Sequence, residues 1–124
     1  MLNRIFICVV GGVMLAAVAC GAASDIDALR AQAEQGDTAA QARLGDCYYK
    51  GNGVVADKAE AVKWYRKAAE QNDGVAQLIL GNCYRYGHGV AKDHAEALKW
   101  YRKAAEHGEA SAEAKEAIQQ MTKK

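Results

Sequence analysis

Apolar and polar positions along the chain recur with the period of an amphipathic α-helix, and one such phrase occurs twice. Residues 60–70 read EAVKWYRKAAE and residues 96–106 read EALKWYRKAAE. On a helical wheel, the apolar side chains of the first copy fill a broad arc and its charged side chains fill the opposite side. An arc this broad is typical of a helix with packed neighbours on both sides. The pattern therefore predicts a stacked helix with its Trp-Tyr pair buried and its cations in solvent.

A second apolar stripe precedes each copy and predicts another helix. In the first copy its members recur at helical spacing and share one face: Ala40, Leu44, Cys47 and Tyr48. Thr38 followed by Gln41 fits a capping box at the start of this helix. Gly51 is expected to end it, because glycine adopts the left-handed conformation without steric cost. Asp57, with Glu60 three residues later, is expected to start the second helix.

The chain is a tandem duplication. Residues 38–73 align with residues 74–109 without a gap and are identical at more than half of the positions, and a fixed period of this length is typical of stacked repeat proteins. Residues 20–37 are predicted to form an N-terminal capping helix, and residues 110–124 a polar closing helix without the repeat signature. We therefore predict an all-α fold, a short right-handed α/α solenoid of stacked helix-turn-helix repeats.

The duplicated positions resemble the Sel-one-like repeat, a relative of the tetratricopeptide repeat. In the first unit the matching residues are Ala40, Leu44, Gly45, Tyr48, Gly51, Gly53, Val54, Asp57, Ala61, Trp64, Tyr65, Lys67, Ala68 and Ala69. The second unit repeats them all one period later, from Ala76 to Ala105. The resemblance implies an all-α superhelix whose family members serve as adaptors for protein complexes. It implies no fixed partner.

The N-terminus has the pattern of a secretory signal peptide, predicted over residues 1–19. A short basic start precedes a continuous apolar run, Ile5–Ala19, which is shorter than the roughly 18–20 residues that a membrane-spanning helix needs. The segment around Cys20 resembles a bacterial lipobox, although Ala17 stands where that pattern usually has Leu. We expect an exported protein, either lipid-anchored in the bacterial envelope through Cys20 or released into the periplasm.

The charge of the chain is nearly balanced. The sequence has 16 basic and 15 acidic side chains, and removal of residues 1–19 would take Arg4 away and leave the two equal. Nucleic-acid binding requires a clustered excess of Lys and Arg, so no nucleic-acid partner is expected. A membrane-surface role driven by basic charge is also disfavoured, which leaves a lipid at Cys20 as the expected membrane contact.

Cys47 and Cys83 occupy equivalent positions in successive units. A disulfide needs Cα atoms within about 7 Å, and equivalent points on stacked helices lie farther apart, since packed helices are roughly 8–10 Å apart. We predict two buried, reduced thiols that act as small apolar fillers.

No catalytic, metal or cofactor site is predicted. His88, His94 and His107 occur only in the second unit, and their pattern does not indicate a set of metal ligands. Serine chemistry needs a nucleophile beside a base, and neither Ser24 nor Ser111 begins a Ser-x-x-Lys motif. The glycine-rich turns follow helices rather than strands, which is the wrong context for a dinucleotide cofactor.

Specificity is expected where the two copies differ, because the shared positions are needed for stacking. On the first helices the differing positions give our candidate partner-binding residues: Arg43, Asp46, Tyr49, Lys50, Leu78, Ile79, Asn82, Arg85 and Tyr86. Tyr and Arg are favoured anchors in protein interfaces. The helical wheel places Leu78 away from the core face, where it is either an exposed recognition residue or, together with Ile79, packed against an adjoining helix.

These observations favour a non-catalytic adaptor or scaffold that binds a protein partner through the concave face formed by the first helices. Two alternatives remain open. One is an inhibitor or immunity protein for a secreted toxin. The other, from a different class, is a protein that binds or hydrolyses cell-wall compounds or β-lactams, as the resemblance to secreted relatives suggests.

Overall fold

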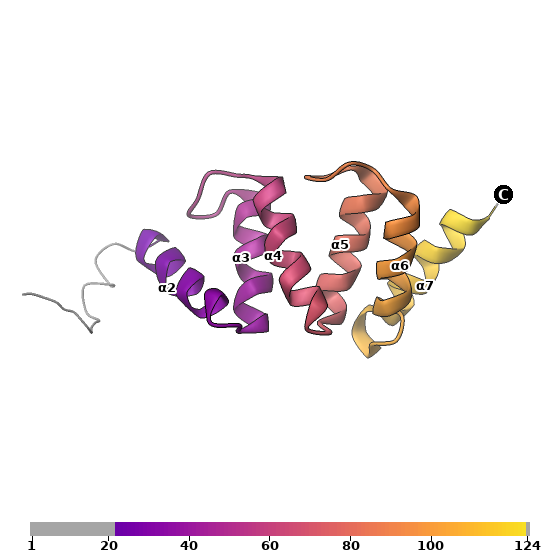
Figure 1. Ribbon diagram of the computed structural model, residues 1–124, viewed down its shortest axis with the longest axis horizontal. Coiled ribbons are helices and arrows are strands. Elements are labelled where there is room, and N and C mark those ends of the chain that lie inside the picture. Colours follow the sequence, from indigo (N-terminus) through magenta and orange to yellow (C-terminus); the bar gives the residue numbers. More distant parts are fainter. Residues whose placement is uncertain (1–21, 124) are drawn as a thin grey trace, which may run out of the picture.

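The computed structural model describes residues 22–123. Over this range the chain forms six helices and no strand: α2 (Ala22–Glu34), α3 (Thr38–Lys50), α4 (Lys58–Glu70), α5 (Gly74–Tyr86), α6 (His94–Ala104) and α7 (Gly108–Thr122). Figure 1 shows them following one another along the long axis of the molecule. The predicted all-α solenoid is confirmed, whereas the predicted signal peptide and Cys20 lie outside the described residues.

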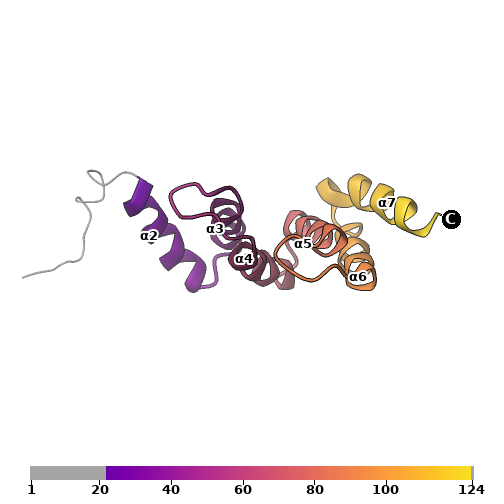
Figure 2. The same ribbon diagram turned by 90° about the horizontal axis from the view of Figure 1, so that it is seen from above.

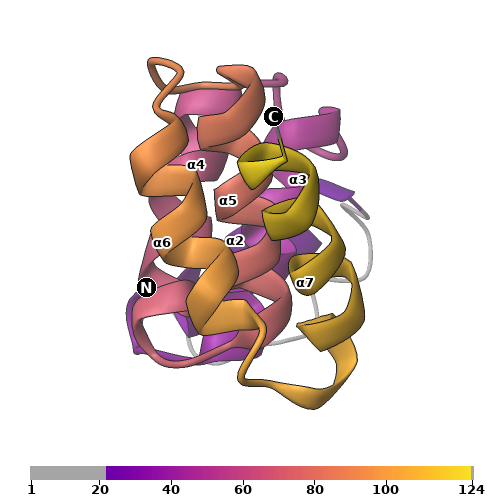
Figure 3. The ribbon, with the colours of Figure 1, turned by 90° about the vertical axis from the view of Figure 1, so that its right-hand side faces the viewer.

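The helices form two rows. Each helix packs on the next along the chain, and α5 also contacts α7. Seen from above, α3, α5 and α7 form one row, and α4 and α6 lie in the other (Figure 2). The end view shows α7 beside both α5 and α6 (Figure 3). The closing helix α7 therefore takes the position of the first helix of a third unit.

Within each unit, a tyrosine ring lies directly on a glycine of the preceding helix. A Cβ atom added at Gly45 would lie 2.8 Å from Cε1 of Tyr65, and one at Gly81 would lie 2.7 Å from Cε1 of Tyr101. Both tyrosines are fully buried, and the neighbouring tryptophans are also buried. Glycine in a helix costs roughly 0.5–1 kcal/mol relative to alanine, but here it lets the two helices approach closely. The predicted burial of the Trp-Tyr pairs is confirmed.

Two buried glutamines bind the main chain at the turns between units. The Nε2 atom of Gln41 donates to the carbonyl of Ala33, and that of Gln77 donates to the carbonyl of Ala69, each at 3.0 Å. Because an unpaired buried carbonyl is costly, these bonds hold the end of each second helix against the next first helix.

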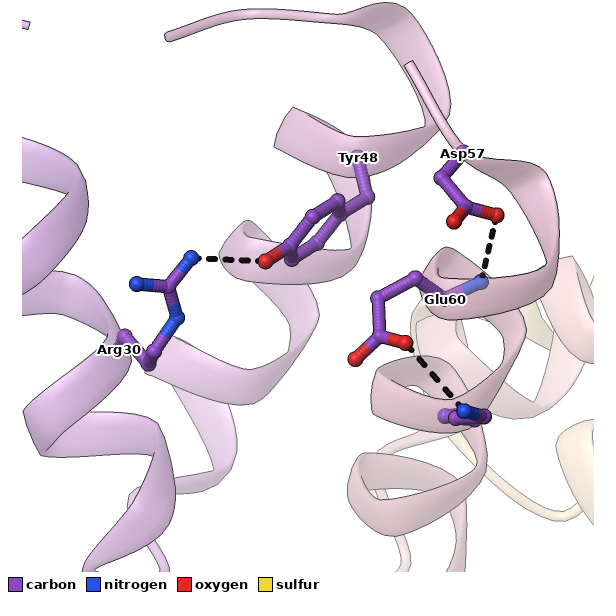
Figure 4. Close-up of polar contacts among 5 residues, drawn as sticks. Arg30, Tyr48, Asp57 and Glu60 are labelled. Carbon is purple, nitrogen blue, oxygen red and sulfur yellow. Dashed lines mark hydrogen bonds and ion pairs between the residues drawn. The ribbon is translucent and has the colours of Figure 1, made fainter. Parts of the chain in front are cut away.

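Aspartates cap the helices. Asp57 accepts a hydrogen bond from the backbone N–H of Glu60 at 3.1 Å, as predicted (Figure 4). The predicted capping box of Thr38 and Gln41 is wrong, because Asp37 is the N-cap of α3 and accepts from the N–H of Ala40. The side chain of Gln41 points instead to the preceding turn.

Arginines on the second helices reach across to tyrosines of the next unit. Arg30 donates to the hydroxyl of Tyr48 at 2.7 Å (Figure 4), and the equivalent Arg66 donates to the hydroxyl of Tyr84. Arg66 therefore contacts the next repeat, contrary to the expectation that the cations of this phrase lie only in solvent. Lys63 follows that expectation, since it is exposed and pairs with Glu60 at 3.3 Å.

The glycines of the turns adopt the left-handed conformation. Gly51 and Gly87 end α3 and α5 with φ angles of 81° and 76°, as predicted. Gly89, with a φ of 78°, also lies against the other repeat, because a Cβ atom there would be 2.3 Å from the carbonyl oxygen of Lys58. The turn of the second unit thus rests on the first turn of α4.

Candidate protein-binding site

Five of the nine predicted partner-binding residues line one cavity between α3 and α5. The cavity has a volume of about 310 Å³, and its lining consists of Asp46, Tyr49, Lys50, Tyr65, Ile79, Asn82, Cys83 and His88. The two first helices supply six of these side chains, Tyr65 comes from α4 and His88 from the turn after α5. Positions that differ between the repeats therefore converge in space at the junction of the two units.

Two tyrosine hydroxyls hold the polar side chains of this region. Tyr65 donates to Oδ1 of Asp46 at 2.5 Å, and Tyr101 donates to Oδ1 of Asn82. The pKa of Tyr65 is raised well above its ordinary value, mainly by burial and to a smaller extent by the hydrogen bond to Asp46. Burial also raises the pKa of Tyr101. Both hydroxyls thus stay protonated and act as donors, which fixes the orientation of Asp46 and Asn82.

An aromatic cluster of Tyr49, His88 and Tyr86 lies at the cavity, and Tyr49 and His88 belong to its lining. The hydroxyl of Tyr49 lies 2.8 Å from Nδ1 of His88, although the residues are 39 positions apart. The ring of Tyr86 lies 5.9 Å from that of His88 and is 53% exposed. His88 is not among the partner-binding residues predicted from the sequence, where it is only a histidine specific to the second unit. The available signal was that it replaces Asn52 at a turn position, where the copies differ.

Cations surround the aromatic cluster. Nζ of Lys58 lies 5.1 Å from the centre of the Tyr49 ring, and the guanidinium of Arg85 lies 5.1 Å from that of Tyr86. Both distances are within the range of a cation–π contact. Arg85 also donates to Oε1 of Gln120 on α7 at 3.1 Å. The position of Arg85 is thereby fixed beside Tyr86.

Two predicted residues lie elsewhere. Arg43 is exposed and lines a separate hollow of about 290 Å³ against α2, together with Leu29 and Cys47. Leu78 is only 9% exposed and packs in the cluster that contains Ala114 of α7. An exposed recognition role for Leu78 is therefore wrong, and the alternative of packing against an adjoining helix is correct. The helix that covers it is α7, which the repeat signature does not mark.

The thiols of the two units have different surroundings. Cys47 and Cys83 are both free, but Cys83 is buried whereas Cys47 is only half-buried. The prediction of reduced thiols therefore agrees with the structure, and the prediction that both are buried is wrong for Cys47. Burial raises the pKa of Cys83 to about 11. Because the thiolate is the reactive form, Cys83 acts as an apolar part of the cavity lining.

Ser111, the serine considered for catalysis that lies in the second half of the chain, has a structural contact. Ser111 donates its hydroxyl proton to the carbonyl of Ala105 at 2.8 Å and thereby ties α7 to the end of α6. Within residues 22–123, no three His, Cys, Asp or Glu side chains are grouped as metal ligands. In the same part of the chain, no helix combines the length and the hydropathy that crossing a membrane would require.

The repeat geometry agrees with a comparison against protein families. The model described as Sel1 repeat matches residues 38–73 and residues 74–109, which together make up more than half of the chain. The chain belongs to the Sel1 repeat family. Proteins of this family are helical repeat modules that mediate protein–protein interactions and are in general non-catalytic scaffolds. None of the curated proteins matched the chain.

Solved structures of Sel1 repeat proteins share the fold. A Sel1 repeat protein from Oxalobacter formigenes is 45% identical with a TM-score of 0.74, over 77% of this chain and 39% of that chain. The protective antigen c5321 of uropathogenic Escherichia coli is 45% identical with a TM-score of 0.68, over 69% and 18%. Helicobacter pylori cysteine rich protein B is 31% identical with a TM-score of 0.66, over 70% and 67%. The chain thus corresponds to less than half of the first two proteins.

Proposed function

We propose that this Sel1 repeat protein is an exported, non-catalytic adaptor of the bacterial envelope that binds a protein partner at the cavity between α3 and α5. One observation carries the proposal. Positions at which the two repeats differ meet in one cavity, and the exposed ring of Tyr86 lies beside it. Specific recognition in a repeat protein needs such a place, since the shared positions are committed to packing.

The composition of the cavity supports binding rather than catalysis. Tyr49, Tyr65 and His88 supply aromatic surface, while Asp46 and Asn82 supply fixed polar groups. Aromatic residues in a partly desolvated pocket are typical anchors of protein interfaces. The buried Cys83 thiol has a pKa of about 11 and is a weak nucleophile at neutral pH.

A crosslinking experiment tests the proposal. A photoreactive amino acid at position 86, beside the cavity, is compared in cells with one at position 63 on the outer face of α4. We expect one partner protein to be captured in stoichiometric amount from position 86 and not from position 63. Substitution of Tyr49→Ala should abolish the capture, whereas Arg102→Ala, on the exposed side of α6, should not.

Other results of these measurements would contradict the adaptor function or the export of the protein. Absence of any position-specific partner, together with saturable binding of a β-lactam or a cell-wall fragment by the folded protein, would contradict the adaptor function. The mass of the mature protein tests export separately. A diacylated N-terminal Cys20 indicates a lipoprotein, an unmodified start near Cys20 indicates a released protein, and a retained Met1 contradicts cleavage of residues 1–19.

A further inference from the structure

The charge around the cavity differs from that of the whole chain. Lys50 lines the cavity, Lys58 lies over Tyr49, and Arg85 lies over Tyr86. The formal charge of the full chain is only +1, so a group of three cations in one place is a local excess. The acidic residue in the lining is Asp46, which already accepts the hydrogen bond from Tyr65.

The aspartates at the ends of the two turns beside the cavity cap helices. Asp57 adjoins Lys58 in sequence, but its carboxylate accepts from the N–H of Glu60 at the start of α4. Asp93, at the start of α6, accepts in the same way from the N–H of Glu96. A carboxylate at a helix N-terminus is balanced by the helix dipole. Among residues 22–123, Lys50, Lys58 and Arg85 form no ion pair. Their charges can therefore meet acidic groups of a partner, while the guanidinium of Arg85 also bonds to Gln120.

The volume of the cavity limits what can enter it. Pockets for small ligands are typically about 300–1,000 Å³, and this cavity, at about 310 Å³, is at the lower end. A single side chain of a partner fits that volume better than a whole cofactor. Because Ile79, Cys83 and the aromatic rings provide most of the apolar lining, the side chain that enters should itself be large and apolar.

The polar groups of the lining define the side chain further. The carboxylate oxygens of Asp46 accept hydrogen bonds, and just one of them is used by Tyr65. An aromatic side chain that carries a donor can therefore bond to it while its ring packs against the wall. Tyrosine and tryptophan combine a large apolar body with such a donor.

From this geometry we infer that the partner presents an acidic segment that inserts one tyrosine or tryptophan into the cavity, with flanking carboxylates on Lys50, Lys58 and Arg85. The inference rests on the proposed function and specifies the chemistry of the partner. Opposite charges at the edge of an interface steer association and set specificity. The aromatic anchor supplies most of the apolar contact.

Labelled peptides test the inference by fluorescence anisotropy. The first peptide has one tryptophan flanked by glutamates; in three matched peptides glutamines or lysines replace the glutamates, or alanine replaces the tryptophan. We expect the glutamate–tryptophan peptide to bind about tenfold more tightly than the glutamine or alanine peptide, and the lysine peptide to bind most weakly. High salt should reduce this preference, because ionic screening shortens the range of exposed charges.

Charge reversal at the cavity gives a second test. The double variant Lys50→Glu/Lys58→Glu should reverse the order of the glutamate and lysine peptides. The control Lys63→Glu/Arg102→Glu makes the same change in net charge on exposed residues of the second helices and should keep the order of the unmodified protein. Both variants replace exposed side chains, and circular dichroism checks that they remain folded.

The contradicting outcomes separate the two proposals. If the glutamate, glutamine and lysine peptides bind equally tightly, or if no peptide binds, the inference that the partner presents an acidic segment is wrong. If capture of the partner from position 86 is still lost in Tyr49→Ala, the adaptor function stands although the inference about an acidic segment is wrong. Equally tight binding of free N-acetylglutamate would show that the cavity takes small anions, which also overturns the inference.

Discussion

The two repeats have the same stacking contacts but differ where they face the cavity. In each repeat, a tyrosine ring covers a glycine and a buried glutamine binds the preceding turn. The hydroxyl of that tyrosine, however, donates to the carboxylate of Asp46 in the first repeat and to the amide of Asn82 in the second. Stacking thus requires a hydrogen-bond acceptor at this position but does not determine its charge.

The difference indicates that the stacking contact does not depend on the charge of the acceptor. The ring of Tyr65 or Tyr101 is buried with either acceptor, so the charge of the acceptor can differ between the repeats while the stacking contact stays the same. A second difference lies at the ends of the units, where Gln71 in the first repeat corresponds to His107 in the second. Substitutions that interchange these features can test each part of the comparison.

The shared contact should be the most sensitive to substitution. We expect Gly45→Ala and Gly81→Ala each to lower the free energy of unfolding by about 2 kcal/mol, because the new Cβ would collide with a buried ring that has little room to move. Urea denaturation measures the effect. Gly108→Ala is the control, since nothing lies within 4 Å of that Cβ. Equal stability of all three variants would show that the helices separate without cost.

Removing the two tyrosine hydroxyls should lower the free energy of unfolding by less, and by different amounts in the two repeats. We expect Tyr65→Phe to cost about 1.5 kcal/mol and Tyr101→Phe about 1 kcal/mol, since hydrogen bonds to a charged acceptor are the stronger ones. Comparing each with the same substitution in an Asp46→Asn background isolates the charge. If the two Phe variants lose the same stability, the charge of Asp46 contributes nothing to stacking.

The buried Cys83 thiol should make the stability of the fold depend on pH in the alkaline range. Burial raises the pKa of Cys83 from 9.0 to about 11, so between these values the unfolded state releases the proton while the folded state keeps it. Stability that is fully present below pH 9 is therefore lost as the pH rises toward 11, by about 1 kcal/mol at pH 10. Thermal denaturation of Cys83→Ala should lack this part of the loss and keep only the loss that the raised pKa values of Tyr65 and Tyr101 cause from about pH 10 upward, whereas Cys47→Ala should retain both. The same pH dependence in both variants would exclude Cys83 as its source.

A substitution at His107, at the end of the second unit, should increase the stability of the protein slightly. In the first unit Gln71 donates to Oε1 of Gln41 at 2.7 Å. The corresponding Oε1 of Gln77 is buried without a partner among residues 22–123. We expect His107→Gln to supply the missing donor and to stabilise the protein by about 0.5 kcal/mol, part of the cost of an unsatisfied buried acceptor. The reciprocal Gln71→His should destabilise the first unit, and a loss of stability in both variants would contradict the explanation.

The stacking of the helices could be predicted from the sequence because every unit must present the same apolar arc to its neighbours. Duplication of the Trp-Tyr phrase was sufficient to assign Trp64 and Tyr65 to the packing. The choice of cap was not fixed in this way, since Asp37 and Thr38 are adjacent and both are good N-cap residues. In the structure Asp37 is the N-cap, with an extended backbone and a carboxylate that accepts from the N–H of Ala40.

The candidate site could be predicted only in part. Positions that differ between copies were found by alignment, and Asp46, Tyr49 and Asn82 among them line the cavity. The contribution of His88 depends on a contact with Tyr49 across the junction of two units, which no local pattern encodes. The burial of Leu78 depends on α7, a helix whose sequence lacks the repeat signature.

Gly89 has a consequence for how the protein tolerates mutation. The residue is exposed, yet its positive φ and the nearby carbonyl of Lys58 leave no room for a side chain. Solvent exposure is commonly used as a guide to variability, and at this position it gives the opposite answer. In a library that samples every residue, Gly89 should be among the least replaceable surface positions. The distance between the two repeats is then set at this position by a contact between main chains, not by side chains of the core.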